Sequence, residues 1–178
     1  MEKEEYAIVL DYLPYGDPMD NKPLPVAQAI GIKNLTLLQL IPRRGINLQP
    51  NEKVYIGEGK RDKIYYIGGR LPREKLTQTA KLNLEDFVKS FVEENEKMFI
   101  DFFNNADAIN TRVHQLELLP GVGKKHTQEI LKERDIKQFE SFKDIKDRIP
   151  SIPDPKKVIE KRILEELMEM QRQNLFVH

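Results

Sequence analysis

The chain has 178 residues, and its 29 basic and 29 acidic side chains give a formal net charge of zero. It contains no cysteine, which excludes disulfides, thiolate zinc sites and cysteine nucleophiles. No run of about 18 apolar residues is present, so we expect no membrane span. The acidic N-terminus lacks the pattern of a signal peptide, and together these features favour a cytoplasmic protein of one or two small domains.

Period-two patterns and turn signals dominate the first part of the chain. The five strands predicted from them are residues 6–12, 27–31, 35–41, 53–57 and 63–71. A loop without periodicity is expected over residues 14–25. Five short strands predict an OB-like β-barrel domain over residues 1–72, and OB-folds bind oligonucleotides. A small barrel that serves as a protein-interaction module has the same pattern, so this alternative stays open.

Basic residues are concentrated in the second half of this predicted barrel. Residues 1–42 carry three Lys/Arg against six acids, whereas residues 43–75 carry nine against four, a local net charge of +5. A local excess of this kind is typical of a surface that binds a polyanion. The candidate phosphate-binding residues of the barrel are Arg43, Arg44, Lys60, Arg61 and Lys63.

Three tyrosines of the barrel are candidate stacking platforms for unpaired bases, namely Tyr55, Tyr65 and Tyr66. Tyr65 and Tyr66 are neighbours on one predicted strand, so their side chains should face opposite sides of the sheet. We therefore expect one of the two to lie in the core.

The period changes to 3.6 residues beyond Leu71, which predicts an all-α domain over residues 73–178. One long helix is expected over residues 84–103, with its phenylalanines in the core. A short helix should end at Pro150, and a last helix should begin with Asp154 as its cap and Pro155 in its first turn. The predicted fold class is α+β, a five-stranded OB-like barrel followed by a helical domain.

Residues 116–126, LELLPGVGKKH, have the features of a tight turn between two helices. Pro120 should end the first helix, and the glycines that follow allow a sharp backbone path. Main-chain amides at the start of the second helix can then point outward together and bind an anionic oxygen. The candidate binding residues are Gly121, Val122, Gly123, Lys124, Lys125 and His126.

This segment resembles the helix-hairpin-helix motif of nucleic-acid-binding proteins, here over residues 106–134. The apolar and glycine positions of the motif match Leu116, Leu119, Gly121, Val122 and Gly123. Thr127 departs from the alanine that is usual at its position. The resemblance implies a monovalent cation held by the main-chain carbonyls of Glu117, Leu119 and Val122. An ordinary glycine-containing turn between helices is the alternative.

The chain also resembles an archaeal family, Domain of Unknown Function 655, over nearly its full length. The matching segments include residues 27–31 (AQAIG), 52–57 (EKVYIG), 61–64 (RDKI), 102–104 (FFN) and 116–121 (LELLPG). The resemblance implies an OB-like or S1-like barrel followed by a helix-hairpin-helix domain. It also implies a protein that binds nucleic acid, with RNA favoured over DNA.

No pattern of catalytic residues accompanies these features. The three histidines, His114, His126 and His178, lack the spacing of a metal site, and nucleotide-binding and nucleophile-elbow motifs are missing from the sequence. We therefore expect a non-catalytic protein without a cofactor, which binds phosphates independently of base sequence. The alternative is a protein-interaction adaptor that uses the helix-hairpin-helix domain as a docking module.

Overall fold

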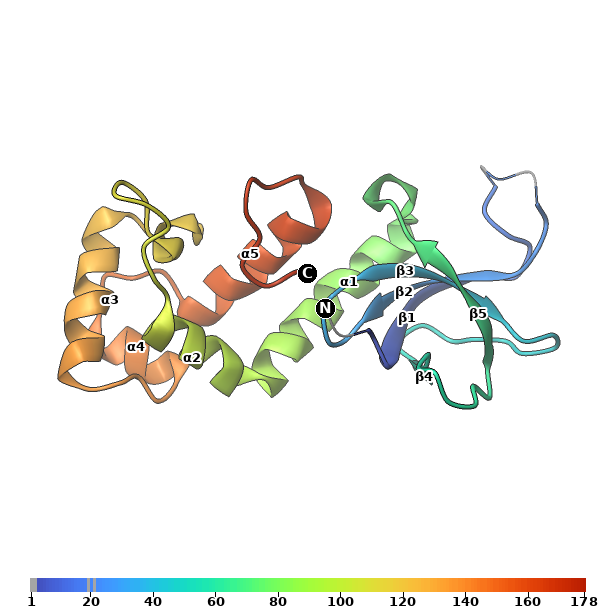
Figure 1. Cartoon of the computed structure of the whole chain (residues 1–178), viewed down its shortest axis with the longest axis horizontal. Coiled ribbons are helices and arrows are strands. Elements are labelled where there is room, and N and C mark those ends of the chain that lie inside the picture. Colours follow the sequence, from blue (N-terminus) through green and yellow to red (C-terminus); the bar gives the residue numbers. More distant parts are fainter. Residues whose placement is uncertain (1–2, 19, 21) are drawn as a thin grey trace. The chain divides into compact units, whose positions relative to one another are not determined.

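Figure 1 shows the computed structural model of the chain, in which residues 3–18, 20 and 22–178 are described. Residues 1, 2, 19 and 21 lie outside the described residues, and two of them fall in the loop predicted over 14–25. Contacts between residues divide the chain into two units. The first is Met1–Phe87 together with Arg172–His178, and the second is Val88–Gln171.

The first unit contains a curled, five-stranded antiparallel sheet that resembles half a barrel (Figure 1). Its strands are β1 (Tyr6–Leu13), β2 (Val26–Gly31), β3 (Leu37–Pro42), β4 (Lys53–Tyr55) and β5 (Ile64–Arg70). All five predicted strands are thus confirmed within a few residues. The order is β4-β1-β2-β3-β5, so among the described residues β4 and β5 each have one strand neighbour and form the two edges.

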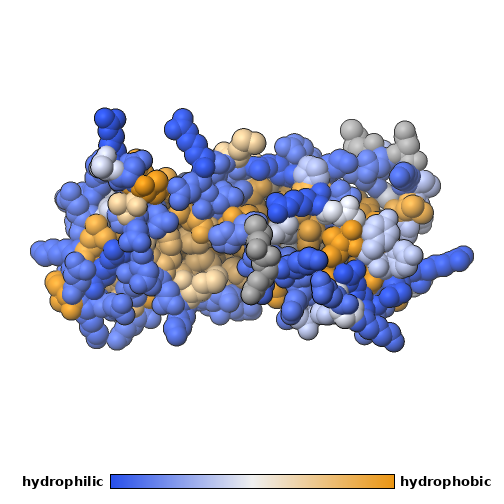
Figure 2. Space-filling view, in the orientation of Figure 1, coloured by the Kyte–Doolittle hydropathy of each residue, from blue (hydrophilic) through white to orange (hydrophobic). Residues whose placement is uncertain are grey.

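Both faces of the sheet are covered at its centre, because all six residues of β2 are buried. One face packs into a cluster of apolar side chains that includes Val9, Ala29, Leu40 and Ile64. Figure 2 shows that, over the sheet, hydrophobic residues reach this side of the surface only in small areas between hydrophilic ones.

The helical elements follow the sheet, and two of them are single 3₁₀ turns. They are η1 (Arg73–Lys75), α1 (Gln78–Glu94), α2 (Glu96–Asn105), η2 (Gln115–Leu118), α3 (Lys124–Ile136), α4 (Phe142–Arg148) and α5 (Pro155–Met168). The predicted change from strands to helices near residue 72 is confirmed. Among the described residues, none of the helices combines the length and hydrophobicity needed to cross a bilayer.

The division between the units falls inside α1, later than the boundary predicted at residue 72. The side-chain amide of Asn83 donates to the main-chain carbonyl of Leu10 over 2.8 Å, which ties the first half of α1 to β1. The side chain of Gln28 accepts from the N–H of Thr77 over 3.0 Å and donates to the carbonyl of Lys75 over 2.7 Å. These bonds satisfy a buried glutamine, and they attach the segment before α1 to the sheet.

The single helix predicted over residues 84–103 is two helices, so that expectation was wrong in one respect. Asn95 lies between α1 and α2 at φ −117° and ψ 33°, outside helical geometry. Its side chain donates to the carbonyl of Phe91 over 2.8 Å and so satisfies the end of α1. Both helices bury an apolar face, so the apolar periodicity of the sequence continues through Asn95. The periodicity therefore gave no sign of the break between the helices.

The end of α4 and the start of α5 lie where the sequence predicts them. Ser141 accepts from the N–H of Asp144 and caps α4, which ends before Pro150. Asp154 accepts from the amides of Lys156 and Lys157, and Pro155 is the first residue of α5. These contacts are ordinary N-terminal caps, and they fix where each helix starts.

Candidate nucleic-acid interface

The turn before α3 contains two glycines with different structural roles. Gly121 has φ +81°, in the left-handed region, and a Cβ there would lie 3.1 Å from Cγ of Pro153. The fold therefore requires glycine at 121. Gly123 is the N-cap of α3 at φ −99°, and a Cβ there would meet no atom within 4 Å. The backbone at Gly123 could therefore accept another residue without strain, and the effect of glycine there is to leave space in front of the helix.

The first turn of α3 has unsatisfied main-chain donors. Gly123 provides no side-chain cap, and the following residues Lys124, Lys125 and His126 begin the helix. Their amides have no acceptor within the helix, because the first four N–H groups of a helix precede the hydrogen-bond ladder. The helix dipole adds partial positive charge at the same place. This arrangement can bind an anionic oxygen.

The two lysines predicted at this turn are not equivalent. The Lys124 ammonium donates to the carbonyl of Arg112 over 2.7 Å and lies 3.0 Å from Oε1 of Glu117. Lys125 is exposed, and its ammonium makes no hydrogen bond or ion pair within the described part of the chain. His126 is half-buried on the same turn. Lys125 is therefore the free charge beside the open amides, whereas Lys124 holds the loop before them.

The first helix of the predicted hairpin is only the 3₁₀ turn η2, which differs from the expected motif. A reciprocal capping box closes this turn. Nδ1 of His114 accepts from the N–H of Leu116 over 3.1 Å, and Glu117 accepts from the N–H of His114 over 2.7 Å. The spacing of a cap residue three before a glutamate is a known capping signal, so this role of His114 is visible in the sequence although it was not predicted.

The surroundings of the capping box lower the pKa of both of its titrating groups, Glu117 and His114. The N–H of His114, followed by the Lys124 ammonium, lowers the pKa of Glu117. Burial lowers the pKa of His114, and the positive charge of Arg134 adds to this effect. An unprotonated Nδ1 is what the cap requires, since it accepts a hydrogen bond.

Thr127 occupies the position where alanine was expected. Its side chain is buried, and its hydroxyl donates to the carbonyl of Gly123 over 2.8 Å. The backbone N–H of Thr127 donates to the same carbonyl over 3.0 Å. The hydroxyl thus has a partner one turn back, so threonine fits this buried site.

The carbonyls predicted to hold a cation are partly occupied by protein donors. The carbonyl of Leu119 accepts from the N–H of Val122 over 3.1 Å, and the next carbonyl, that of Leu118, accepts from Arg162 over 3.2 Å. Leu119 keeps one lone pair, but a guanidinium already brings positive charge to this turn. The monovalent cation at Glu117, Leu119 and Val122 stays a prediction, and none of the contacts proposed below depends on it.

Arg162 and Glu166 form a buried ion pair that supports the hairpin. Arg162 Nε lies 2.8 Å from Oε2 of Glu166, and the side chains are 6% and 0% exposed. Through its bond to the carbonyl of Leu118, Arg162 ties α5 to η2. A buried guanidinium with several acceptors fixes a main-chain position more firmly than apolar packing alone.

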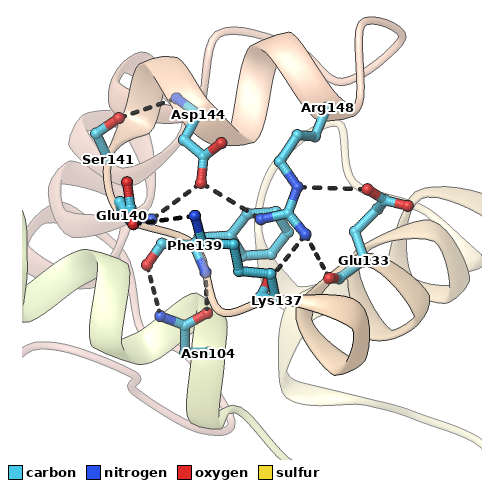
Figure 3. A network of polar contacts seen from close by, with 8 residues as sticks. All are labelled: Asn104, Glu133, Lys137, Phe139, Glu140, Ser141, Asp144 and Arg148. Atoms are coloured by element: carbon cyan, nitrogen blue, oxygen red, sulfur yellow. Dashed lines mark hydrogen bonds and ion pairs between the residues drawn. The ribbon is translucent and has the colours of Figure 1, made fainter.

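A polar network holds the other end of α3, as Figure 3 shows. Arg148 of α4 donates to the main-chain carbonyls of Glu133 and Lys137, the latter over 2.8 Å, and packs on the ring of Phe139. Asn104 donates to the carbonyl of Phe139 and accepts from its N–H, over 3.0 and 2.8 Å. The carbonyls at the C-terminal end of α3 are thereby satisfied, and α3 is held at both ends.

The structure brings the predicted basic residues of the first unit together. Arg43 follows β3, and its Nε donates to the carbonyl of Arg61 over 2.7 Å. Nε of Arg61 in turn donates to the carbonyl of Gly57 over 2.7 Å. Arg44 and Lys60 are exposed, and neither bonds to any residue that the structure describes. These last two are therefore the free cations of the group.

Lys63, the remaining predicted cation of the first unit, is already paired. Its ammonium lies 2.6 Å from Oε2 of Glu52. This contact is the main reason why the pKa of Glu52 is lowered. Because Lys63 is half-exposed, the pair can still face a ligand, but its charge is partly neutralised.

Tyr65 and Tyr66 are both exposed, at 63% and 48%, so the expectation that one lies in the core was wrong. The register between β3 and β5 explains the error. Ile41 pairs with Tyr66 and Pro42 with Ile64, which leaves Tyr65 as an extra residue in a bulge. A bulge interrupts the alternation of side chains. The two rings meet edge to face with centroids 5.4 Å apart, and Tyr55 instead packs on Tyr6.

Comparison with known proteins identifies the family. A sequence profile for the family described as "Protein of unknown function (DUF655)" matches residues 3–178. The chain belongs to the DUF655 family. An uncharacterized DUF655-like relative, protein MJ0038 of Methanocaldococcus jannaschii, is 42% identical over 174 residues, which cover 98% of this chain and 79% of the relative. The crystal structure of the DUF655 protein Af1531 from Archaeoglobus fulgidus has a TM-score of 0.86 and 44% identity, and covers 98% of this chain and all of that one.

Proposed function

We propose that this DUF655 protein binds nucleic acid without catalysing a reaction, and that the N-terminus of α3 is its main phosphate site. The observation that carries the proposal is the combination at Gly123. Unsatisfied amides begin a 13-residue helix there, with open space in front of them and the free ammonium of Lys125 beside them. An anionic oxygen suits such a site. Phosphate contacts of this kind give affinity without sequence selection.

The first unit supplies a second kind of contact in this proposal. Its strand order β4-β1-β2-β3-β5 is compatible with an OB-like barrel that is open between β4 and β5. Exposed Tyr65 and Tyr66 give flat faces for stacking, and Arg44 and Lys60 give free positive charge. Stacking together with backbone charge is the usual way to hold single strands. This feature favours a single-stranded ligand, and RNA is the strand that we propose.

Substitution of Gly123 tests the proposal without damaging the fold. Aspartate is a preferred N-cap and should stabilise α3, because its carboxylate accepts from the free amides. The same carboxylate repels phosphate and occupies its donors. We expect Gly123→Asp to be at least as stable as the wild type and to bind a 20-nucleotide single-stranded RNA about tenfold more weakly, as measured by fluorescence anisotropy at two salt concentrations.

Gly123→Asn is the matched control, because it has the same shape and capping ability without the charge. Its loss of affinity should be clearly smaller than that of Gly123→Asp. If Gly123→Asp is folded and its affinity for RNA and for DNA is unchanged, the helix terminus is not a phosphate site. The protein-interaction adaptor would then be the better interpretation of the second unit.

A further inference from the structure

A groove of about 800 Å³ opens in the first unit between the two edge strands. Its walls come from the N-terminal segment, the turn between β2 and β3, the loop after β4, and the end of β5. Apolar side chains of Leu38, Ile56 and Ile67 line it. The volume is in the range of sites that bind small molecules or short segments of a polymer. None of the phosphate contacts proposed above except Arg61 belongs to this groove.

The walls of the groove are fixed by specific contacts. The carboxylate of Glu4 accepts from the N–H groups of Lys33 and Asn34, over 2.8 and 2.6 Å. It lies across Gly31, where a Cβ would approach it within 2.2 Å. On the other wall the hydroxyl of Tyr55 accepts from the N–H of Gly59 over 3.0 Å. Such walls need no rearrangement before a ligand enters, and preorganisation favours binding.

The charges of the groove select an anionic ligand. Of its acids, Glu4 is satisfied by main-chain amides, and Glu58 pairs with Lys3 over 3.4 Å. Arg70 is exposed at the end of β5, and its guanidinium makes no hydrogen bond or ion pair to the residues that the structure describes. Arg61 donates through Nε to a carbonyl of its own loop, so its two terminal nitrogens can donate to other partners. Two guanidinium groups beside an apolar floor suit a ligand with flat rings and phosphates.

The edge strands are poorly suited to the other polymer that could fill the groove, an added peptide strand. β4 has only three residues. In β5 the register against β3 leaves Gly68 as an extra residue, and Gly69 has φ +112°. Bulges of this kind interrupt the regular row of donors and acceptors that strand addition needs. The groove therefore favours a ligand that is recognised through side chains.

We propose that this groove binds a short segment of single-stranded nucleic acid, with an unpaired base on the apolar floor and phosphates at Arg61 and Arg70. The proposal rests on the proposed function, because it assigns the segment of bound strand that the first unit takes. Glu5 also lines the groove and is exposed. Its carboxylate opposes the same phosphates, so removal of its charge should strengthen binding.

The test is a titration of the full, ¹⁵N-labelled chain with the tetranucleotide r(UUUU), followed by NMR. We expect saturable shifts of the amides of Thr36, Gly57 and Arg70. Arg70→Gln should raise the dissociation constant about fivefold, and Glu5→Gln should lower it about twofold. Arg172→Gln, which removes an exposed arginine of the same unit outside the groove, should leave it unchanged. Opposite effects of the two charge changes cannot arise from general loss of structure.

Other results would overturn the groove assignment in distinguishable ways. Shifts confined to residues 121–125 would reject the groove and leave the helix-terminus site intact. No shift anywhere, with r(UUUU) or with a 20-nucleotide single strand, would reject both. Groove shifts with the neutral peptide acetyl-Thr-Val-Thr-Val-Thr-amide, but none with r(UUUU), would show strand addition in place of nucleic-acid binding.

Discussion

The hairpin before α3 and the groove of the first unit offer anions different chemical groups. At the hairpin the donors are main-chain amides, which every substitution except proline leaves in place, and side chains mainly hold the backbone in place. At the groove the donors are guanidinium groups, while main-chain amides are used to fix an acid of the wall. The difference predicts that the hairpin is sensitive to its scaffold and the groove to its charges.

The buried pair under the hairpin should give the largest effect. Arg162→Leu removes the guanidinium that lies 2.8 Å from the buried carboxylate of Glu166, and breaking a buried ion pair on one side costs about 3–5 kcal/mol. Native-state hydrogen exchange should show faster opening of α3 and α5, with β2 and β3 unchanged, because the loss is confined to the second unit. RNA binding at the hairpin should fall with it.

The double variant Arg162→Leu with Glu166→Leu is the control for this effect. It replaces the pair with apolar side chains, which in other proteins is often nearly neutral. Recovered protection in the double variant would confirm that the cause is the buried carboxylate of Glu166 without the guanidinium of Arg162. Equal loss in both variants would show instead that the bond from Arg162 to the carbonyl of Leu118 is indispensable.

A pair of glycine substitutions compares the two units more finely. Gly121→Ala forces a side chain into φ +81° and toward Pro153, and we expect a loss of about 1–2 kcal/mol or more. Gly45→Ala in the first unit has nearly the same φ, +79°, but its Cβ would meet nothing within 4 Å. Urea unfolding of both variants therefore separates backbone strain from the contact with Pro153. Equal losses would mean that Pro153 moves aside without cost.

The sequence predicted the strands, the cap of the last helix and the turn at Gly121 because these features depend on local signals. Strand alternation, the Asp154 cap and the glycines of the turn are each visible within a few residues. The exposed pair Tyr65 and Tyr66 was missed because a bulge is a property of two paired strands. The periodicity of one strand cannot show that this strand has an extra residue relative to the strand it pairs with.

The local excess of positive charge in the sequence did not show which basic side chains are free to contact a ligand. Residues 43–75 have an excess of five positive charges, yet Arg43, Arg61 and Lys63 are all engaged within the unit. These partners lie on other strands and loops, so composition could not show which cations are free. Arg70 was not selected from the sequence for the same reason, although it lines the groove.

The two hairpin lysines should separate affinity from stability. Lys125→Ala removes a free charge beside the open amides and should account for most of the roughly tenfold loss expected for the double alanine variant. Lys124→Ala breaks the ion pair between this exposed lysine and Glu117 and should cost little stability, with a smaller loss of affinity than Lys125→Ala. Anisotropy and urea unfolding measure the two effects. Equal losses of affinity would show that Lys124 leaves Glu117 when RNA binds.

The smallest expected effect is a dependence of hairpin stability on pH. Burial and Arg134 lower the pKa of His114 in the folded chain, while Glu117 and Asp107 act in the opposite direction. The unfolded chain thus binds the proton more readily, and stability rises with pH in this window. The contribution is complete above the ordinary histidine pKa of about 6.5. It is lost as the pH falls through the lower, folded value.

The physical cause is the cap itself, since protonated Nδ1 cannot accept from the N–H of Leu116. His114→Asn keeps a capping oxygen that does not titrate, so it should remove this slope while preserving the cap. Hydrogen exchange of the Leu116 and Leu119 amides, which are both hydrogen-bonded in the capped turn, measures the difference between about pH 5 and 7 after correction for intrinsic rates. Glu117 also has a lowered pKa, but its contribution is lost only below about pH 4.5, outside this range. An unchanged slope in His114→Asn would assign the pH dependence to a group other than the cap.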